Sequence, residues 1–474
     1  MTSISSISPH GQSLAGLPLE SDAPLIVHID FKSPYAFLAV EPTRRMLAEA
    51  GLVADWRPFV LDIGSYLGTA KLAKDGKVEK QNRSQEQWSG VKYAYFDCRR
   101  YANLADQTIR GTVKIWDTNL PAIGMWWIKL HESLTAQNSS SGLLQRYIDA
   151  IYQPFWRREY DAENIESVVQ TLEQIQAPLE GFREFAAGQG KVFNQSFQEA
   201  AFASGVYGVP TYLLPGHTDE SGCPSRFFGR EHLPRIGWML GGAKGPGPDV
   251  AYDLADDIAP GALEKSATQP GVGESRELPI YFDFKSPNSY LALNGLLALK
   301  DDGIRLRWHP IDHKPLKLPA AQAANEDRST MHRRVRGEYM AADIARYAPH
   351  PLADIYQTTD CSYANMGLLW LAEEAPDRVD DYVKTIFAAL WRDHADITDL
   401  NFITSALARV MGPDVDDQQW QAFVQGRGQA ALAEAYGDGV EAGAFYAPTM
   451  KLGDEPFQGR AQLPLIRARL LAGI

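Results

Sequence analysis

The chain has 474 residues, 45% of them hydrophobic and 22% charged, and a formal net charge of −13. This composition is that of a globular protein large enough for more than one domain. No run approaches the ~20 apolar residues of a membrane span, and no basic block offsets the negative charge, so we expect neither a membrane nor a nucleic-acid partner.

An identical pentapeptide, Asp-Phe-Lys-Ser-Pro, occurs at residues 30–34 and again at residues 283–287. Each copy follows a short apolar run, 25–29 or 278–282, that predicts a strand. Each copy precedes a helical pattern that ends near a glycine. Because serine is a preferred N-cap and proline a preferred first helical residue, both pentapeptides predict a turn into a helix.

Later landmarks recur in the same order in both halves of the chain. They are Trp-x-Pro at 56–58 and 308–310, a Tyr/Asp/Arg/Tyr/Ala set at 93–102 and 339–348, an Asp/Gly/Trp set at 117–127 and 360–370, Pro-Thr at 210–211 and 448–449, and Gly-Arg at 229–230 and 459–460. Chance matches would not keep this order. The sequence therefore indicates a tandem duplication of one unit.

Within each copy, a strand, a helix and a strand precede a long stretch with helical character, and a Pro-Thr strand follows it. Strands that flank a helix, with more helix between them, predict an α/β domain with an inserted helical subdomain. We predict a flexible N-terminal tail at 1–23, a first domain at 24–240, a linker rich in Gly, Pro and Asp at 241–277, and a second, divergent domain at 278–474.

The order of these motifs resembles the thioredoxin fold of the DsbA-like superfamily. More narrowly, it is similar to the family of 2-hydroxychromene-2-carboxylate isomerases and kappa-class glutathione transferases. The motifs that carry the resemblance are residues 30–39, Lys92-Tyr93 with Asp97 and Arg100, residues 205–211 and residues 228–233. The resemblance implies two tandem thioredoxin-like domains and a glutathione-dependent isomerase or transferase that acts on an aromatic or α,β-unsaturated acid.

The turn of disulfide oxidoreductases in this superfamily holds Cys-Pro-x-Cys. Here the turns read Ser-Pro-Tyr-Ala at 33–36 and Ser-Pro-Asn-Ser at 286–289, so dithiol exchange is chemically unavailable at either turn. The three cysteines of the chain lie far apart and form no metal motif, so we expect no bound metal and a reduced, cytoplasmic protein.

By the resemblance, the thiol comes from glutathione, and Ser33 is the catalytic residue that donates a hydrogen bond to its thiolate. Lys92 would meet a glutathione carboxylate and Glu231 the γ-glutamyl ammonium. Val209 and Pro210, joined by a cis bond, would align the tripeptide like an added strand. Each residue also has a structural interpretation: Ser33 as a helix cap, Lys92 as a solvated lysine, Glu231 as a partner of a helix dipole and Pro210 as a strand-entry proline.

In the second copy, Ser286 and Pro448 are the possible equivalents of Ser33 and Pro210. The second copy has lost two charges, however, because Glu338 and Ala461 stand where the first has a lysine and a glutamate. Charge-assisted hydrogen bonds contribute ~1.5–3 kcal/mol each, so we expect poor glutathione binding there. The second copy would then be structural, form an intramolecular pseudo-dimer with the first, or bind another ligand.

A rival hypothesis from another class is a non-catalytic thioredoxin-like binding protein, in which both serines are only helix caps. The absence of Cys-x-x-Cys disfavours a disulfide oxidoreductase.

Overall fold

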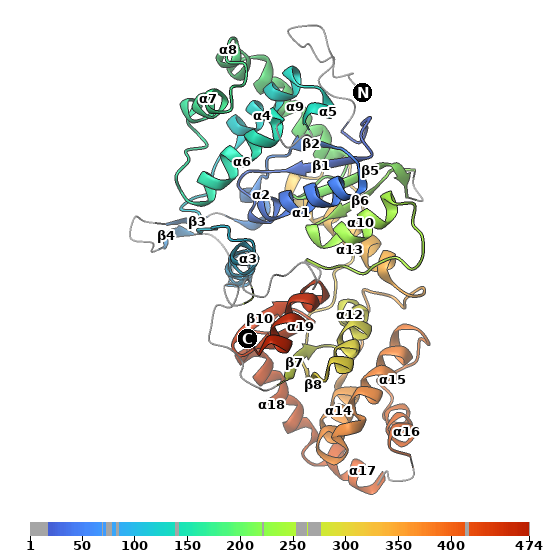
Figure 1. Cartoon of the computed structure of the whole chain (residues 1–474). Coiled ribbons are helices and arrows are strands. Elements are labelled where there is room, and N and C mark those ends of the chain that lie inside the picture. Colours follow the sequence, from blue (N-terminus) through green and yellow to red (C-terminus); the bar gives the residue numbers. More distant parts are fainter. Residues whose placement is uncertain are drawn as a thin grey trace. The chain divides into compact units, whose positions relative to one another are not determined.

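The computed structural model describes residues 18–68, 70–72, 78–81, 85–137, 142–219, 222–252, 263, 276–412 and 417–473. The chain divides into two compact units: Met1–Val250 with Gln322–Val335, and Ala251–Ala321 with Arg336–Ile474 (Figure 1). The division after Val250 falls inside the segment expected as a linker. Most of the expected tail and most of the expected linker lie outside the described residues.

The first unit is built on a four-stranded sheet with the order β2-β1-β5-β6. Its strands are β1 (Leu25–Ile29), β2 (Ala54–Pro58), β5 (Thr211–Thr218) and β6 (Pro224–Phe228). β1 runs parallel to β2 and antiparallel to β5, so that Val27 lies opposite both Trp56 and Tyr212. A separate pair of strands, β3 (Ala70–Leu72) and β4 (Val78–Gln81), follows the short helix α2 (Ile63–Leu67).

Helices cover this sheet on both sides. They are α1 (Pro34–Ala50), α3 (Gln85–Leu104), α4 (Asn119–His131), α5 (Leu134–Gln137), α6 (Leu143–Trp156), α7 (Ile165–Gln174), α8 (Phe182–Ala187), α9 (Gln189–Ala203), η1 (Arg230–His232) and α10 (Leu233–Leu240). α1 packs against α3, η1 and α10, while α4 packs against β2 and α9. Figure 1 shows α1 and α10 together on one side of the sheet and α4 to α9 gathered on the other.

The second unit has a four-stranded sheet with the corresponding order, β8-β7-β9-β10. The strands are β7 (Glu277–Phe282), β8 (Arg305–Pro310), β9 (Thr449–Leu452) and β10 (Glu455–Gln458). As in the first unit, β7 is parallel to β8 and antiparallel to β9, which pairs antiparallel with β10. The two sheets therefore share strand order and strand direction.

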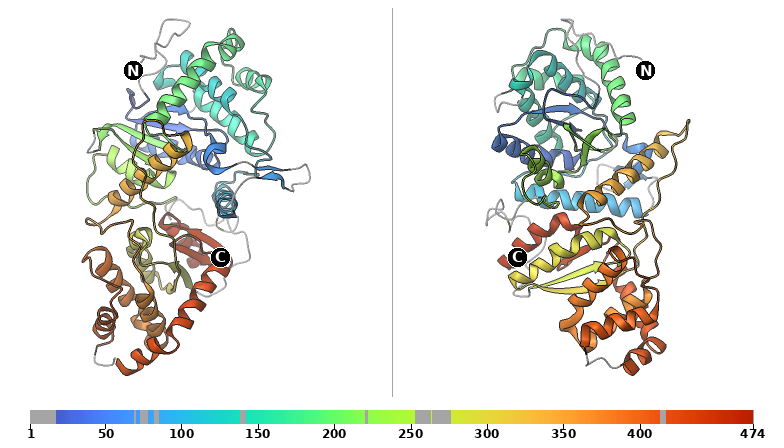
Figure 2. Two further views of the ribbon diagram at one scale, coloured as in Figure 1. Left: turned by 180° about the vertical axis from the view of Figure 1, so that it is seen from behind. Right: turned by 90° about the vertical axis from the view of Figure 1, so that its right-hand side faces the viewer.

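Helices also pack around the sheet of the second unit (Figure 2). They are α12 (Pro287–Ala298), η3 (Leu299–Asp302), α13 (Arg328–Tyr347, whose first residues belong to the first unit), α14 (Ser362–Glu374), η4 (Pro376–Arg378), α15 (Val379–Trp391), α16 (Leu400–Met411), α17 (Asp417–Gln425), α18 (Gly428–Glu441), η6 (Arg460–Gln462) and α19 (Leu463–Ala472). Among all the helices described, none is long and apolar enough to span a membrane.

A tyrosine packed on a glycine fixes the helices of each unit in the same way. The hydroxyls of Tyr147 and Tyr382 each donate to a backbone carbonyl at 2.9 Å. A Cβ atom at Gly124 would lie 2.0 Å from the Tyr147 hydroxyl oxygen, and one at Gly367 would lie 2.3 Å from that of Tyr382. No side chain fits at either position unless the tyrosine moves, because real Cβ contacts do not occur at such distances.

Candidate functional site

The first turn places a serine hydroxyl at the N-terminus of a helix. Ser33 is the N-cap of α1, and its Oγ accepts a hydrogen bond from the Ala36 amide at 3.2 Å. The same hydroxyl donates to the Val209 carbonyl at 3.4 Å, a long contact that joins the turn to the loop before β5. The Ser33 hydroxyl thus caps the helix through its oxygen and points its proton toward Val209. The role of a helix cap therefore does not exclude the role of a hydrogen-bond donor to a ligand.

The second turn repeats this geometry. Ser286 Oγ accepts from the Ser289 amide at 3.3 Å and donates to the Ala447 carbonyl at 3.1 Å. The Val209–Pro210 and Ala447–Pro448 peptide bonds are both cis, and the first of these is expected from the family resemblance. The geometry of the turn therefore does not distinguish the two units.

The charged residues predicted to hold glutathione come from two helices that pack on α1. Lys92 lies on the exposed face of α3, with its Nζ 5.7 Å from the centroid of the Trp88 ring. Glu231 is half-buried in η1, and its carboxylate folds back over Gly229, which has a φ of 108°. The structure thus brings Ser33 close to Val209, whereas Lys92 stands in solvent on a neighbouring helix.

The Asp97 and Arg100 pair has a structural role, as its spacing along a helix indicates. Asp97 Oδ1 accepts from Arg100 at 2.8 Å, and both side chains are buried. The hydroxyl of Tyr35, two residues after the turn serine, donates to the other oxygen of Asp97 at 3.1 Å. This contact fastens the start of α1 to α3.

None of the three cysteines occupies a turn position. Burial raises the pKa of Cys98 and of Cys361 well above the usual value of a thiol, so both thiols stay protonated near neutral pH. Cys223 is exposed, in the connection between β5 and β6. The described part of the chain therefore offers no activated thiol at either turn.

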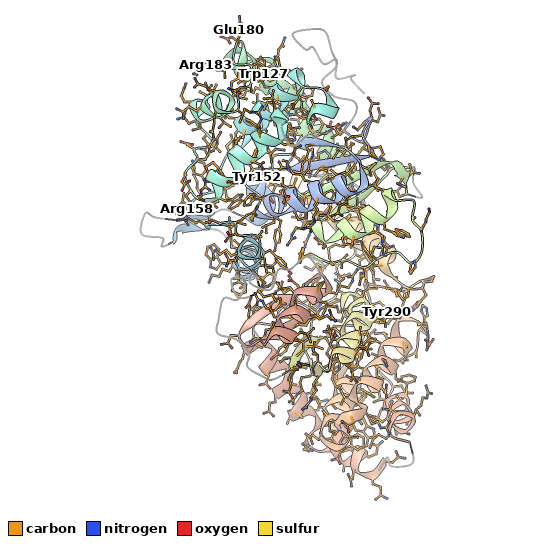
Figure 3. The ribbon with its side chains drawn as sticks, viewed as in Figure 1. Trp127, Tyr152, Arg158, Glu180, Arg183 and Tyr290 are labelled. Atoms are coloured by element: carbon orange, nitrogen blue, oxygen red, sulfur yellow. The ribbon has the colours of Figure 1, made fainter. Side chains whose placement is uncertain are left out.

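Sequence reasoning missed a buried polar network directly beneath the first turn. Asp30 Oδ1 accepts from the Thr118 hydroxyl at 2.6 Å, and Asp30 Oδ2 accepts from the Leu61 amide at 2.7 Å. Lys32 Nζ lies 3.4 Å from Asp30 Oδ2 and 3.4 Å from the Thr118 hydroxyl. Tyr152 (Figure 3) donates its hydroxyl to the Asp30 carbonyl at 3.0 Å. The recurrence of the same aspartate and lysine in both pentapeptides is a sequence signal for these two members of the network, but not for their partners Thr118 and Leu61, which are distant in sequence.

The corresponding network of the second unit has a different charge. Lys285 Nζ lies 2.6 Å from Asp283 Oδ2 and 2.8 Å from Asp312 Oδ1. Burial alone would lower the pKa of Lys285, but the Asp283 and Asp312 carboxylates together raise it above its usual range. One lysine thus faces two carboxylates in the second unit and one in the first.

A second buried cluster lies on β1 and β2 of the first unit. Asp55 bonds to Arg57 and Lys129 at 2.6 Å each. Burial would raise the pKa of Asp55, but these two cations hold it well below its usual range. Burial and the Arg57 charge lower the pKa of the neighbouring His28 from 6.5 to about 3, so its imidazole is neutral at physiological pH. These groups lie on β1, β2 and α4, outside the turn.

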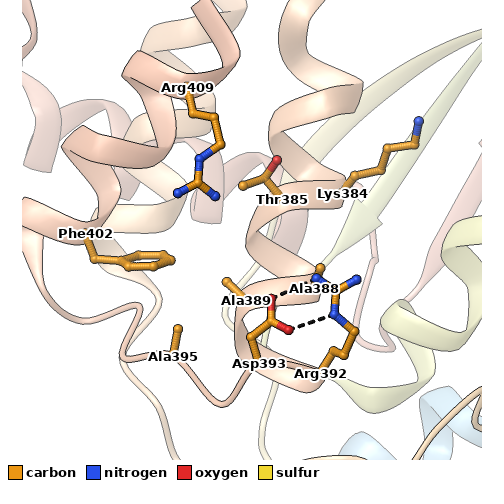
Figure 4. Close-up of a pocket in the computed structure, with 9 residues that line it drawn as sticks. All are labelled: Lys384, Thr385, Ala388, Ala389, Arg392, Asp393, Ala395, Phe402 and Arg409. Atoms are coloured by element: carbon orange, nitrogen blue, oxygen red, sulfur yellow. Dashed lines mark hydrogen bonds and ion pairs between the residues drawn. The ribbon is translucent and has the colours of Figure 1, made fainter.

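A pocket of about 330 Å³ lies in the second unit between α15 and α16 (Figure 4). Its lining includes the cationic residues Lys384, Arg392 and Arg409 and the aromatic residue Phe402. Arg392 is already paired with Asp393 through bonds of 2.7 and 2.8 Å. Neither Ser286 nor Pro448 lines this pocket, so it is separate from the second turn.

Comparisons with known proteins show which chains this one is similar to. Residues 277–471 match the family model described as the DSBA-like thioredoxin domain. A 2-hydroxychromene-2-carboxylate isomerase from Pseudomonas sp. (strain C18) is 30% identical over 192 residues, which are 39% of this chain and 84% of that protein. The isomerase of the same name from Pseudomonas putida is 28% identical over 199 residues, or 40% and 92% of the two chains. The solved structure of a selenomethionine 2-hydroxychromene-2-carboxylate isomerase is 26% identical, has a TM-score of 0.31, and covers 40% of this chain and 90% of its own.

Mixed four-stranded sheets flanked by helices, together with the family match, define a protein of the DsbA-like thioredoxin class. Each isomerase relative corresponds to about two fifths of the chain. Within this class, the chain belongs to the family of 2-hydroxychromene-2-carboxylate isomerases.

Proposed function

We propose that the first unit is a glutathione-dependent isomerase of an aromatic or α,β-unsaturated acid, with its site at the Ser33 turn. The observation that carries this proposal is the Ser33 hydroxyl, fixed at the N-terminus of α1 in a turn without a cysteine. The names of the relatives support isomerisation of an aromatic carboxylate as the reaction class. We propose further that the two units are tandem copies of one domain, each with an inserted helical subdomain.

The contacts of Ser33 suit a hydroxyl that donates to a bound anion. Its proton points to the Val209 carbonyl across 3.4 Å, a contact too long to contribute much. The proton can therefore turn toward a ligand at small cost, while the oxygen continues to accept from Ala36. The N-terminus of a helix of 17 residues adds a partial positive charge, which favours a thiolate over a thiol.

The thiol has to come from outside the chain, because none of the three cysteines stands at a turn position. Cys98 and Cys361 are buried thiols with raised pKa values, and Cys223 lies in the connection between β5 and β6. Bound glutathione would supply a thiol able to add reversibly to a conjugated carbon, which permits rotation about the former double bond. In this arrangement Ser33 orients the sulfur, and the backbone at Val209 pairs with the tripeptide as an added strand would. Lys92 and Glu231 attract its carboxylate and its ammonium group.

Calorimetric titration of the full chain with glutathione tests this proposal. Loss of one charge-assisted bond of ~1.5–3 kcal/mol should weaken binding by about 10- to 150-fold in Lys92→Met and in Glu231→Gln. Glu338→Gln, at the position in the second unit that matches Lys92, is the control and should bind glutathione as the unaltered chain does. The proposal is wrong if the unaltered chain binds no glutathione, or if both first-unit variants bind it unchanged.

A separate assay decides between the enzyme and a non-catalytic binding protein. Isomerisation of 2-hydroxychromene-2-carboxylate by the full chain should require added glutathione, and Ser33→Ala should reduce its rate. Glutathione binding without any isomerisation of this acid or related unsaturated acids would favour the binding protein.

A further inference from the structure

We propose that Lys32 binds the carboxylate of the acid substrate beside the thiol held at Ser33. This assignment rests on the proposed function of the first unit and adds a substrate-binding residue to it. Lys32 immediately precedes Ser33 in the turn, and its side chain is only 4% exposed. Its ammonium group is therefore buried, on the residue that precedes the proposed catalytic serine.

The Lys32 ammonium group has only long contacts with its polar neighbours. An ammonium group has three donors, and those of Lys32 meet Asp30 and Thr118 at 3.4 Å, beyond the usual 2.7–3.2 Å of N–H···O bonds. Asp30, in contrast, already accepts much shorter bonds from Thr118 and Leu61. An incoming carboxylate could offer Lys32 a shorter, charge-assisted bond without depriving Asp30 of its better donors.

The equivalent lysine of the second unit, Lys285, makes short ion pairs with two carboxylates. Lys285 is held at 2.6 Å by Asp283 and at 2.8 Å by Asp312. Asp312 immediately precedes His313, whose amide donates to Asp283 at 2.8 Å, just as the amide of Leu61 donates to Asp30 at 2.7 Å. The residue that precedes Leu61 is Val60, so the first unit has valine where the second has its additional carboxylate.

The difference in charge predicts a difference in ligand. Counted by residue type, the first turn has one lysine and one aspartate, whereas the second has one lysine and two aspartates and therefore one more acidic group than basic ones. An anionic ligand gains from Lys32 in the first unit and is repelled at the second turn. If Lys32 only neutralised Asp30, its removal would weaken acid binding through the unpaired Asp30 carboxylate, and Asp30→Asn added to Lys32→Met would restore that binding. If Lys32 binds the acid itself, the double variant should stay as weak as Lys32→Met.

The test compares binding of 2-hydroxychromene-2-carboxylate and of its methyl ester to the full chain by calorimetry. Lys32→Met should weaken binding of the acid by about tenfold or more and leave binding of the ester unchanged. Val60→Asp retains Lys32 and copies the second unit, and it should produce the same selective loss if Lys32→Met proves unstable. Asp312→Val is the matched control in the second unit and should leave acid binding in the first unit as it was.

Acid binding that is unchanged in both Lys32→Met and Val60→Asp, or lost equally for acid and ester, would overturn the assignment. Because these titrations are made without glutathione, they do not depend on the proposed cofactor. Failure of glutathione to bind the unaltered chain would overturn the proposed function alone.

Discussion

The two turn serines allow the role of a helix cap to be separated from the role of a binding group. Ser33→Ala removes an acceptor that lies 3.2 Å from a backbone amide, and Ser286→Ala removes one at 3.3 Å. Replacing an N-cap serine by alanine costs about 1 kcal/mol. We therefore expect both variants to lower the free energy of unfolding of their own unit by about the same amount.

Only Ser33→Ala should also change the acidity of bound glutathione. A hydrogen bond to a charged group contributes ~1.5–3 kcal/mol, and one pKa unit corresponds to about 1.4 kcal/mol. The serine contributes this bond in the complex and gives up only a 3.4 Å contact to Val209. Its removal should raise the pKa of the bound thiol by about 1–2 units. Ser286→Ala should leave that pKa unchanged.

The assay is the ultraviolet absorbance of the thiolate, followed against pH in protein saturated with glutathione. Urea unfolding of the same variants measures how much the free energy of unfolding falls when the cap is lost. An unshifted thiol pKa in Ser33→Ala, together with the expected loss of stability, would show that this serine is a cap and no more. An equal shift in Ser286→Ala would refute the asymmetry between the units.

Three further predictions concern the frame that holds the site. Burial, helped by a nearby guanidinium, lowers the pKa of His28 from 6.5 to about 3. The unfolded chain therefore takes up a proton first as pH falls below 6.5, and the free energy of unfolding should drop by about 1.4 kcal/mol per pH unit in urea titrations, but not in His28→Phe. Asp55→Asn should cost about 3–5 kcal/mol in the same assay because two buried cations lose their carboxylate, whereas Lys129→Met should cost less. Gly124→Ala should lower the melting temperature by inserting a methyl group 2.0 Å from a hydroxyl oxygen, and Tyr147→Phe in the same chain should recover part of the loss.

Each of these has a contradicting result. A pH slope that survives in His28→Phe would mean that another group titrates in that range. Equal losses of stability in Asp55→Asn and Lys129→Met would contradict the second prediction. They would indicate that the Asp55–Lys129 pair alone sets the stability, without a contribution from Arg57. Strictly additive effects of Gly124→Ala and Tyr147→Phe would mean that the two residues do not collide.

Local chemistry explains why much of the fold could be predicted. The turn serine, the proline after it and Gly51 mark the ends of α1, which the structure places at Pro34–Ala50 with a left-handed C-cap. These signals lie within a few residues of the backbone they control. The long stretch with helical character that the sequence predicts in each copy likewise has a strong local pattern, and the structure has α3 to α9 in the first and α13 to α18 in the second.

The polar network under the turn could not be predicted, because its partners are distant in sequence. Thr118 lies 88 residues from the aspartate it bonds, and Leu61 lies 31 residues from it. Nothing in the local pattern of either residue indicates that contact. The assignment of Gln322–Val335 to the first unit depends on tertiary packing in the same way.

The repeated pentapeptide alone is insufficient evidence for two binding sites. Its serine caps a helix in both units with nearly equal bonds, and this structural role is enough to explain its presence twice. The residues around the pentapeptide differ. The first unit has Val60 at the position where the second has Asp312, and it has Thr118, which donates to Asp30, where the second has the buried Cys361. Any selectivity between the turns must therefore arise from residues outside the pentapeptide, and exchange of Val60 and Asp312 addresses that difference most directly.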